Sequence, residues 1–370
     1  MKRLGVLFVV SLIFVIGVLG SSRAEGPLSL VKTVPLGSTT HDVALKDNFA
    51  YAATKLGLTV LDISNPAAPI PRGSVAINSS GGSQGVEVAG QYAYVASRDA
   101  GLKIVDVSNP DAPRVVGSAK VSGQAWDVAI KDNVAYVASY GKGQIQLFDV
   151  SNPASPRLIR SIGIFKWTNP GADEVYLEKL NSYATAGNAL VTGVSVTGNI
   201  LVSVDWGLGR LTYHDVTNAA NPVFRGTHQA PFLLKALADP DRDVVYMLSA
   251  YGGTSGIYTV PISIMAPDRS TYHAECSQCD YLSSNGGMGQ GGLALSSSGN
   301  HLLYDGGGKT VLHVVDSSDP TFLKELVSVR IGRTGVGLAE HMGLAIRGDY
   351  IFLAAGAFGV QVYLYPPLSD

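Results

Sequence analysis

The sequence contains few cysteines and few charged residues, and it lacks the patterns that mark several classes of protein. Of its 370 residues, two are cysteines and 15% are charged. It has no run of basic residues and a formal net charge of −2, which argues against nucleic acid as a partner. No Ser-His-Asp arrangement, nucleophile elbow or phosphate-binding glycine loop is convincing. No catalytic motif therefore defines an activity.

Long apolar segments are also absent, except at the N-terminus. A basic start precedes an apolar run over residues 4–19, and 22–24 offers small side chains where a signal peptidase reads them. We therefore expect residues 1–24 to be a signal peptide, with retention as a membrane anchor as the alternative. After cleavage, the chain is expected to be exported (periplasmic, cell-surface or extracellular) and not membrane-spanning.

Glycine and proline are abundant, and one short pattern recurs. The 43 glycines and 18 prolines fit an all-β protein rich in turns. The stretch 101–113 reads Gly-Leu-Lys-Ile-Val-Asp-Val-Ser-Asn-Pro-Asp-Ala-Pro, and the same pattern occurs at 57–69 and 143–156. Its aspartates at 62, 106 and 149 lie 44 and 43 residues apart. Short strands repeated at such a period are typical of a propeller, an array or a solenoid.

Counting the units predicts the fold. Each regular unit contains four short strands, the innermost at 43–45, 86–88 and 128–130 in the first three units. Residues 27–36 resemble the last strand of a unit, and 359–366 resemble the third strand of one, so the N-terminus should complete the last unit and close the ring. We predict a seven-bladed β-propeller of four-stranded blades, formed as one domain by residues 25–370. Six or eight blades are the alternatives, because the fifth unit is weak.

The recurring strand and its Asp-x-Ser-Asn-Pro ending resemble the LVIVD repeat, a family of propeller repeats found mostly in exported prokaryotic proteins. The match is close at 57–69, 101–113 and 143–156, partial in units four, six and seven, and poor in unit five. The resemblance implies the propeller fold and export. The family has no settled activity, so the resemblance implies no catalytic residue.

The propeller topology assigns loops to faces. The loops that lead into each inner strand and those between the second and third strands lie on one face, here called the top face. The remaining turns lie on the bottom face. Two insertions, near 165–192 and 262–292, interrupt the period between one blade and the next, so both should decorate the top face.

The predicted binding site lies on the top face, around the mouth of the central channel. Aromatic side chains and convergent polar groups around a channel are the default location for a ligand. A protein, peptide or glycan is the expected partner, with no cofactor. The alternative for these positions is packing, with Trp126 wedged between blades. The residues predicted to bind the ligand are Trp126, Tyr140, Trp206, Tyr251, Phe358 and Lys235.

Two other functions compete with a binding role. One is a metal-assisted hydrolase or lactonase-like enzyme that holds one divalent metal ion at the channel mouth. Its carboxylates and histidines would be His41, Asp42, Asp127, Glu340 and His341, although no motif fixes their geometry. The other is a purely structural surface protein, whose aromatic top face could be mutated without consequence. For the site positions themselves, the alternative is that small residues and an aspartate at the start of an inner strand fit a crowded axis and cap backbone amides.

Both cysteines lie in the second insertion, as a Cys-x-x-Cys motif. Cys276 and Cys279 have no second pair and no directly following histidine, which excludes a four-cysteine zinc site and leaves haem attachment unsupported. In an exported protein we expect them to form a disulfide. A metal site with His273 is the alternative. Redox catalysis is less favoured, because the motif lies in a loop.

The acidic residues of the repeats are predicted to shape turns. Asp62, Asp106 and Asp149 precede Asn-Pro turns, where Asp and Asn accept local backbone hydrogen bonds. The stretch 239–243 alternates carboxylates as calcium loops do, but it lacks the glycine and the distal glutamate of such loops. A tight turn is therefore the favoured interpretation.

Overall fold

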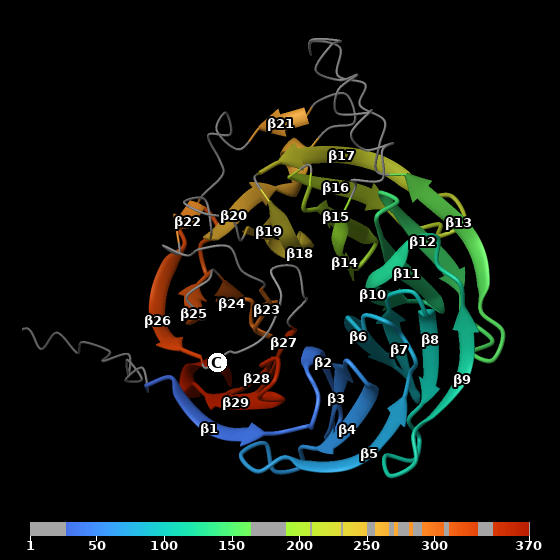
Figure 1. Ribbon diagram of the computed structural model, residues 1–370. Coiled ribbons are helices and arrows are strands. Elements are labelled where there is room, and N and C mark those ends of the chain that lie inside the picture. The colour runs from blue at the N-terminus through green and yellow to red at the C-terminus, as the bar shows by residue number, and fades with distance from the viewer. Residues whose placement is uncertain are drawn as a thin grey trace, which may run out of the picture.

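Seven β-sheets arranged around a central axis make up the fold (Figure 1). A computed structural model describes residues 27–163, 190–207, 209–230, 232–249, 256–265, 270–272, 281–283, 291–306, 311–331 and 343–369. The signal peptide predicted at 1–24 lies outside these residues. Among the described residues, no helix is long and apolar enough to cross a membrane.

The first three blades follow the predicted repeat strand by strand. Each is an antiparallel sheet of four consecutive strands, and the predicted inner strands lie within β2, β6 and β10. Blade 1 contains β2 to β5, at Thr40–Lys46, Phe49–Thr54, Gly57–Asp62 and Ile70–Ala76. Blade 2 contains β6 to β9, at Gly85–Ala89, Tyr92–Ser97, Gly101–Asp106 and Arg114–Ala119. Blade 3 contains β10 to β13, at Gln124–Lys131, Val134–Tyr140, Gln144–Asp149 and Arg157–Gly163.

Blades 4 to 7 keep the four-stranded plan with two modifications, described below. Blade 4 contains β14 to β17, at Val191–Thr197, Ile200–Asp205, Arg210–Asp215 and Val223–Gln229. Blade 5 contains β18, β19, β20 and β22, at Leu233–Asp239, Val244–Ser249, Gly256–Pro261 and Tyr281–Ser283. Blade 6 contains β23 to β26, at Leu293–Leu295, His301–Gly306, Val311–Asp316 and Lys324–Arg330. Blade 7 contains β27 to β29 and β1, at Leu344–Arg347, Tyr350–Ala354, Val360–Leu364 and Ser29–Val34.

The ring closes as the sequence predicted. β1 pairs antiparallel with β29, so the N-terminal strand is the outermost strand of the last blade (Figure 1). This pairing covers the edge of β29, which would otherwise present unpaired backbone groups. The predicted seven-bladed propeller with four-stranded blades is confirmed.

The second predicted insertion is partly built into the sheets. β22, within 262–292, is the fourth strand of blade 5, which explains why that unit looked incomplete in the sequence. β21, at Ser270–Tyr272, pairs in parallel with β17 and adds a fifth strand to blade 4. Residues 164–189, which contain most of the first insertion, lie outside the described residues.

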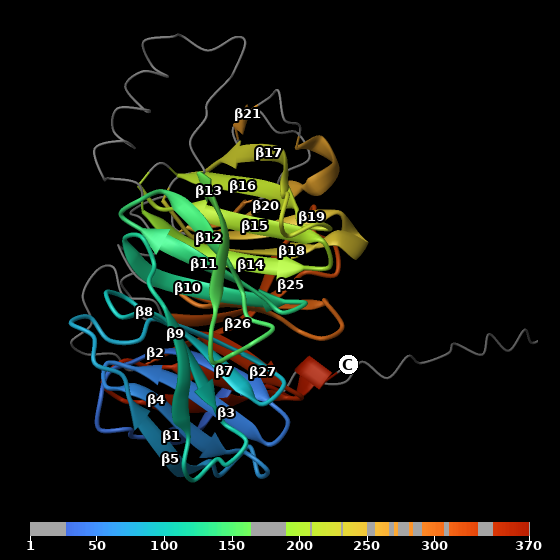
Figure 2. The same cartoon turned by 90° about the vertical axis from the view of Figure 1, so that its right-hand side faces the viewer.

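Apolar side chains on both faces of each blade form the core. Alternation along a strand sends successive side chains to opposite neighbours. In β8 of blade 2, Leu102 and Ile104 pack toward blade 3, whereas Val105 packs toward blade 1. Seven clusters of buried residues fill the seven interfaces between neighbouring blades in the described part of the chain. A side view shows the strands crossing the thickness of the ring (Figure 2).

On the bottom face, the Asp-x-Ser-Asn-Pro sequence builds a closed hydrogen-bonded turn. One oxygen of Asp106 accepts hydrogen bonds from the backbone N–H and the hydroxyl of Ser108, at 3.0 and 2.7 Å. Its other oxygen pairs at 2.6 Å with Arg114, on the next strand. Asp62 and Asp149 have equivalent serine and arginine partners. The predicted turn role of these aspartates is confirmed.

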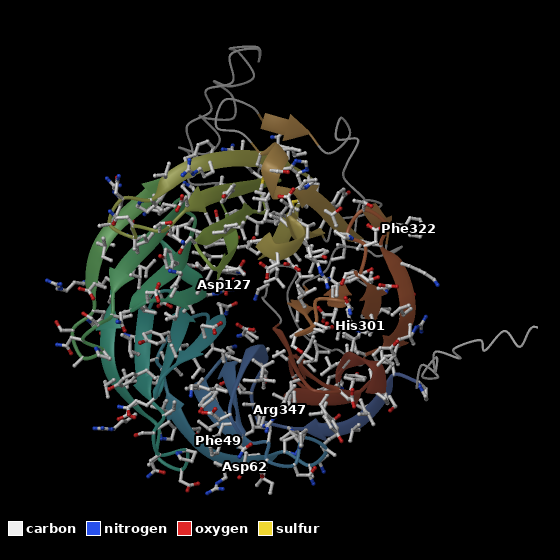
Figure 3. All side chains as sticks on the ribbon, turned by 180° about the vertical axis from the view of Figure 1, so that it is seen from behind. Phe49, Asp62, Asp127, His301, Phe322 and Arg347 are labelled. Carbon is white, nitrogen blue, oxygen red and sulfur yellow. The ribbon has the colours of Figure 1, made fainter. Side chains whose placement is uncertain are left out.

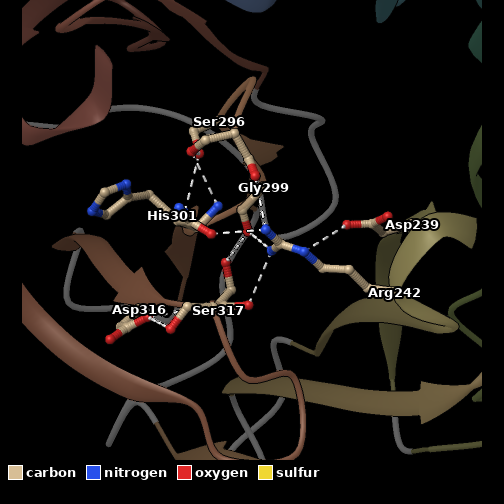
Figure 4. Close-up of polar contacts among 10 residues, drawn as sticks. Asp239, Arg242, Ser296, Gly299, His301, Asp316 and Ser317 are labelled. Carbon is tan, nitrogen blue, oxygen red and sulfur yellow. Dashed lines mark hydrogen bonds and ion pairs between the residues drawn. The ribbon is translucent and has the colours of Figure 1, made fainter. Parts of the chain in front are cut away.

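Arginines on the bottom face also join neighbouring blades. Arg242 donates hydrogen bonds to the Ser298 carbonyl at 2.7 Å, the Asn300 side chain at 2.8 Å and the Ser317 carbonyl at 3.2 Å, all in blade 6 (Figure 4). It belongs to the 239–243 stretch, which forms a tight turn with a short 3₁₀ helix at Pro240–Arg242, as the sequence predicted.

Arg347 plays the same role where the ring closes. It reaches from blade 7 to the Ile63 carbonyl at 3.2 Å and the Asn48 side chain at 2.8 Å in blade 1. Ile63 and Ser317 occupy the same repeat position, directly after the turn aspartate. The two arginines therefore make equivalent contacts at two different interfaces.

Candidate binding site at the top face and central channel

An irregularity in strand pairing shapes the top face at the start of several inner strands. The register between the first and second strands shifts at His41 in blade 1, at 126–127 in blade 3, at Thr192 in blade 4 and at Leu234 in blade 5. Such β-bulges insert an extra residue and redirect the side chains beside it. The bulges therefore set the orientation of the side chains around the channel mouth.

The two predicted channel aspartates join blades through backbone amides. Asp42 accepts a hydrogen bond from Val43 N–H, in its own strand, and another from Val86 N–H in blade 2, both at 2.9 Å. Asp127 likewise accepts from Val128 N–H at 3.0 Å and from Val194 N–H, in blade 4, at 3.1 Å. Both residues are at least 95% buried. This is the amide-capping role that the sequence analysis held as an alternative.

Charged side chains alternate with glycines at this level of the ring, up to blade 6. The spacing is steric: a Cβ at Gly343 would lie 1.5 Å from Oδ1 of Asp42 in the adjacent blade. The equivalent positions, from blade 1 to blade 7, are Asp42, Gly85, Asp127, Gly193, Lys235, Gly292 and Gly343. A Cβ at Gly85 would likewise lie 2.9 Å from Oδ1 of Asp127, so each aspartate has room because the preceding blade carries a glycine.

His41 serves the packing of the top face. Its ring is 1% exposed, and Nδ1 lies 2.7 Å from the Ser83 carbonyl of blade 2. Because a carbonyl oxygen can only accept a hydrogen bond, Nδ1 of His41 carries the proton and is the donor. His41 therefore joins blade 1 to blade 2.

Trp126 anchors an aromatic and cationic group at the mouth. The indole is 3% exposed and stacks on Tyr140, with ring centroids 4.4 Å apart and an interplanar angle of 18°. The guanidinium of Arg98 lies 4.6 Å from the centroid of the same indole, which is cation–π distance. Tyr140 and Arg98 are half-buried. They are the members of this group that a ligand can reach, and Trp126 positions them.

A second aromatic pair lies across blades 4 and 5. Trp206, in the loop between β15 and β16, lies 5.6 Å from Phe232, just before β18, and both rings are half-buried. Phe232 has φ of 48° and Arg98 has φ of 27°. Bulky residues rarely adopt a left-handed backbone, and such strain gathers at functional sites. Both strained residues contact a tryptophan of the top face.

Two further predicted residues lie on this side of the ring. Phe358 is half-buried in the loop between β28 and β29. Lys235, at the start of β18, places Nζ 4.0 Å from Oδ2 of Asp127. Burial opposes the charged form, but the carboxylates of Asp127, Asp42 and Glu87 outweigh it and raise the pKa of Lys235. The remaining predicted residues lie outside the described residues: Tyr251, His273, Cys276, Cys279, Glu340 and His341.

A cavity of about 320 Å³ runs along the central axis, lined by inner strands from all seven blades. In Figure 3, Asp127 lies beside this central space and Phe322 at the outer margin. Asp42, Glu87, Asp127 and Lys235 supply its charged lining. The Glu87 side chain is exposed to the cavity, although protein surrounds it on nearly all sides. Desolvation is the main reason that its pKa is raised to about 7.

Sequence analysis missed three of these residues: Glu87, Arg98 and Phe232. A signal for Glu87 was available, because it is the one charged residue in the middle of an inner strand, where other blades have Ala44, Ala129 or Leu237. Arg98 and Phe232 gave no signal, because their roles depend on backbone conformation and on partners in another blade.

The hydrolase alternative requires a group of metal ligands. No group of three or more His, Cys, Asp or Glu side chains among the described residues could hold a metal ion. His41, Asp42 and Asp127 are engaged in contacts that join blades, as given above. The hydrolase alternative therefore gains no support from the part of its proposed site that the structure describes.

Comparisons with known proteins identify the repeat. The LVIVD repeat family matches three consecutive segments, residues 37–76, 80–121 and 122–163. These segments correspond to blades 1, 2 and 3, in agreement with the resemblance noted in the sequence. No curated protein matches the chain.

Solved structures share the fold at low sequence identity. The β-propeller domain of Cps50 (Swd1) from Myceliophteria thermophila has a TM-score of 0.64 and 12% identity, covering 91% of this chain and 99% of that domain. The computationally designed Ika8 protein has a TM-score of 0.53 and 11% identity, covering 90% and 99%. As many as 1386 solved chains match, so the fold alone does not indicate a function.

Proposed function

We propose that this seven-bladed propeller, whose first three blades are LVIVD repeats, is an exported binding or scaffolding module. Its partner, a protein, peptide or glycan, docks on the top face around the channel mouth. The apolar N-terminal segment of the sequence supports export. Aromatic rings with one polar edge suit partners of this kind, because they offer a flat apolar surface and a directional hydrogen bond.

The observation that carries this proposal is the difference between the two faces. On the bottom face, repeated polar turns engage their carboxylates and arginines in contacts within and between blades. On the top face, half-buried rings and a guanidinium border the channel mouth: Tyr140, Trp206, Phe232, Phe358 and Arg98. These groups leave part of their surface accessible for a partner.

Variants of the half-buried top-face rings test the proposal. The double variant Trp206→Ala, Phe358→Ala removes two half-buried rings from the top face. The control Phe322→Ala removes a ring that is 71% exposed at the outer margin. Removing anchoring aromatic rings from an interface costs about 2 kcal/mol or more in total, so we expect partner recovery from the native compartment to fall at least tenfold.

Quantitative mass spectrometry of co-purified material, supported by a glycan array, provides the measurement. Circular dichroism confirms that each variant is folded. Equal recovery with the wild type, the double variant and the control would show that the top-face rings do not contact the partner, and would contradict the proposal.

A further inference from the structure

Glu87 differs from the two aspartates of the central channel, because no hydrogen bond ties its carboxylate to a neighbouring blade among the described residues. Asp42 and Asp127 are each bonded to two backbone amides, and Asp127 also lies beside Lys235. No hydrogen bond or ion pair joins the Glu87 carboxylate to another side chain in the described part of the chain. The charge of Lys235 and the backbone N–H of Val88 are what favour its charged form. Unlike Asp42 and Asp127, Glu87 therefore does not join its blade to a neighbouring blade through its carboxylate within the described ranges.

Maintaining a carboxylate in this position is unfavourable for folding. Protein surrounds Glu87, and the nearby carboxylates of Asp42 and Asp127 repel its charge, while Lys235 offsets part of that repulsion. An alanine or leucine occupies the equivalent position in most other blades and avoids this cost. A charge that is held against desolvation in a cavity is a candidate functional group.

The chemistry of the cavity favours a cation with an aliphatic stem. Three carboxylates outnumber one ammonium in the lining, so a positive charge is attracted. The hydroxyls of Ser195 and Thr197 offer acceptor oxygens, and Ala44 and Ala129 present apolar surface. A volume of about 320 Å³ suits a small molecule or a single side chain.

We propose that the central channel binds an aliphatic primary ammonium group, with the Glu87 carboxylate as its counter-ion. The ammonium donates hydrogen bonds to Glu87, and its stem packs along the apolar inner strands. The group arrives either on a free amine or as the lysine side chain of a docked peptide, since both present the same chemistry. The ammonium contacts with Glu87 do not involve the top-face rings, so failure of n-butylammonium binding is distinguishable from failure of the proposed function.

Binding should follow the ionisation of Glu87. The cation interacts with the charged carboxylate, and the pKa of Glu87 is raised to about 7 in the empty channel. Asp42 on β2, Asp127 on β10 and Lys235 on β18 are the other charged groups that face it. We expect affinity to be highest above pH 7 and to fall about tenfold for each pH unit below that value, because binding must then release a proton.

Titration with n-butylammonium, followed by NMR on the full chain, tests the site. n-Butanol is the neutral control of similar shape. At pH 8 we expect saturable binding of one n-butylammonium per chain and at least tenfold weaker binding of n-butanol, because the charge-assisted hydrogen bond is lost. Glu87→Gln should weaken n-butylammonium at least tenfold, whereas Glu325→Gln, a carboxyl outside the channel, should leave it unchanged.

The peptide Ala-Lys-Ala distinguishes the two sources of the ammonium. If a docked peptide supplies it, this peptide binds more tightly than n-butylammonium, and the double variant Trp206→Ala, Phe358→Ala weakens the peptide alone. If a free amine supplies it, that variant changes neither ligand. Equal affinity for n-butanol, no saturable binding of n-butylammonium, or unchanged binding in Glu87→Gln would overturn the proposal.

Discussion

Glu87 and Asp127 carry the same charge at the same channel, yet their surroundings give them opposite effects on the fold. Asp127 accepts two backbone hydrogen bonds and lies beside Lys235, so its carboxylate joins blade 3 to blade 4. Glu87 is desolvated and repelled by two nearby carboxylates, and the charge of Lys235 and the Val88 N–H offset only part of this cost. The residue type in the sequence does not distinguish these roles; the partners do.

The pH dependence of stability reports on Glu87 directly. Its pKa rises from an ordinary 4.5 to about 7 in the fold. Between pH 4.5 and about pH 7, Glu87 binds more protons in the folded chain than in the unfolded chain. The stability that protonated Glu87 contributes therefore decreases as the pH rises through this range and is fully lost above about pH 7.

Glu87→Gln should remove this dependence. We expect the variant to melt at least about 2 °C above the wild type at pH 8, and the difference to shrink towards pH 4.5, where Glu87 is protonated in the folded chain. Thermal unfolding followed by circular dichroism at several pH values measures this. A wild-type advantage at pH 8 would mean that Glu87 has a stabilising partner in the native channel.

At the scale of the element, the outer strand of one blade packs against the Asn-Pro turn of the next. Arg72, on β5, pairs at 2.8 Å with Asp111, in the turn of blade 2. Gly117, on β9, lies so close to the turn of blade 3 that a Cβ there would come within 1.9 Å of the Pro153 carbonyl oxygen. The Asn-Pro sequence thus serves its own blade and the preceding one.

Substitution of Gly117 tests this packing. Because Gly117→Ala forces a Cβ against backbone, we expect it to lower the free energy of unfolding by about 1–3 kcal/mol. Gly163→Ala is the matched control, since a Cβ there meets no atom of the described residues within 4 Å, and it should change stability by less than about 0.5 kcal/mol. Denaturant unfolding compares the two, and equal effects would show that blade 3 does not press on β9.

The elements also show how far the sequence could predict the fold. The period of Asp62, Asp106 and Asp149 predicted the blades, and the complementary ends predicted the pairing of β1 with β29. The fourth strand of blade 5 was not predicted, because β22 spans three residues and carries no repeat pattern. The top-face contacts of Arg98 and Phe232 depend on backbone strain and on other blades, which one strand's pattern does not encode.

For the whole molecule, the ring must be held together at seven interfaces, one of which is closed by the two ends of the chain. β1 completes blade 7 by pairing with β29 and then leads into blade 1, and Arg347 adds hydrogen bonds from blade 7 to blade 1. The structural bonds of the repeat are concentrated on the bottom face and at the channel wall. The rings at the top of the channel are half-buried, and they are the surface on which we propose that the partner docks.

Site-specific photo-cross-linking in the native compartment tests this division between the faces most directly. A cross-linking residue is placed either at Ala357, exposed on the top face, or at Ala68, exposed in a bottom-face turn. We expect a specific adduct from position 357 and none from position 68. An adduct from position 68 alone, or equal adducts from both positions, would contradict docking on the top face.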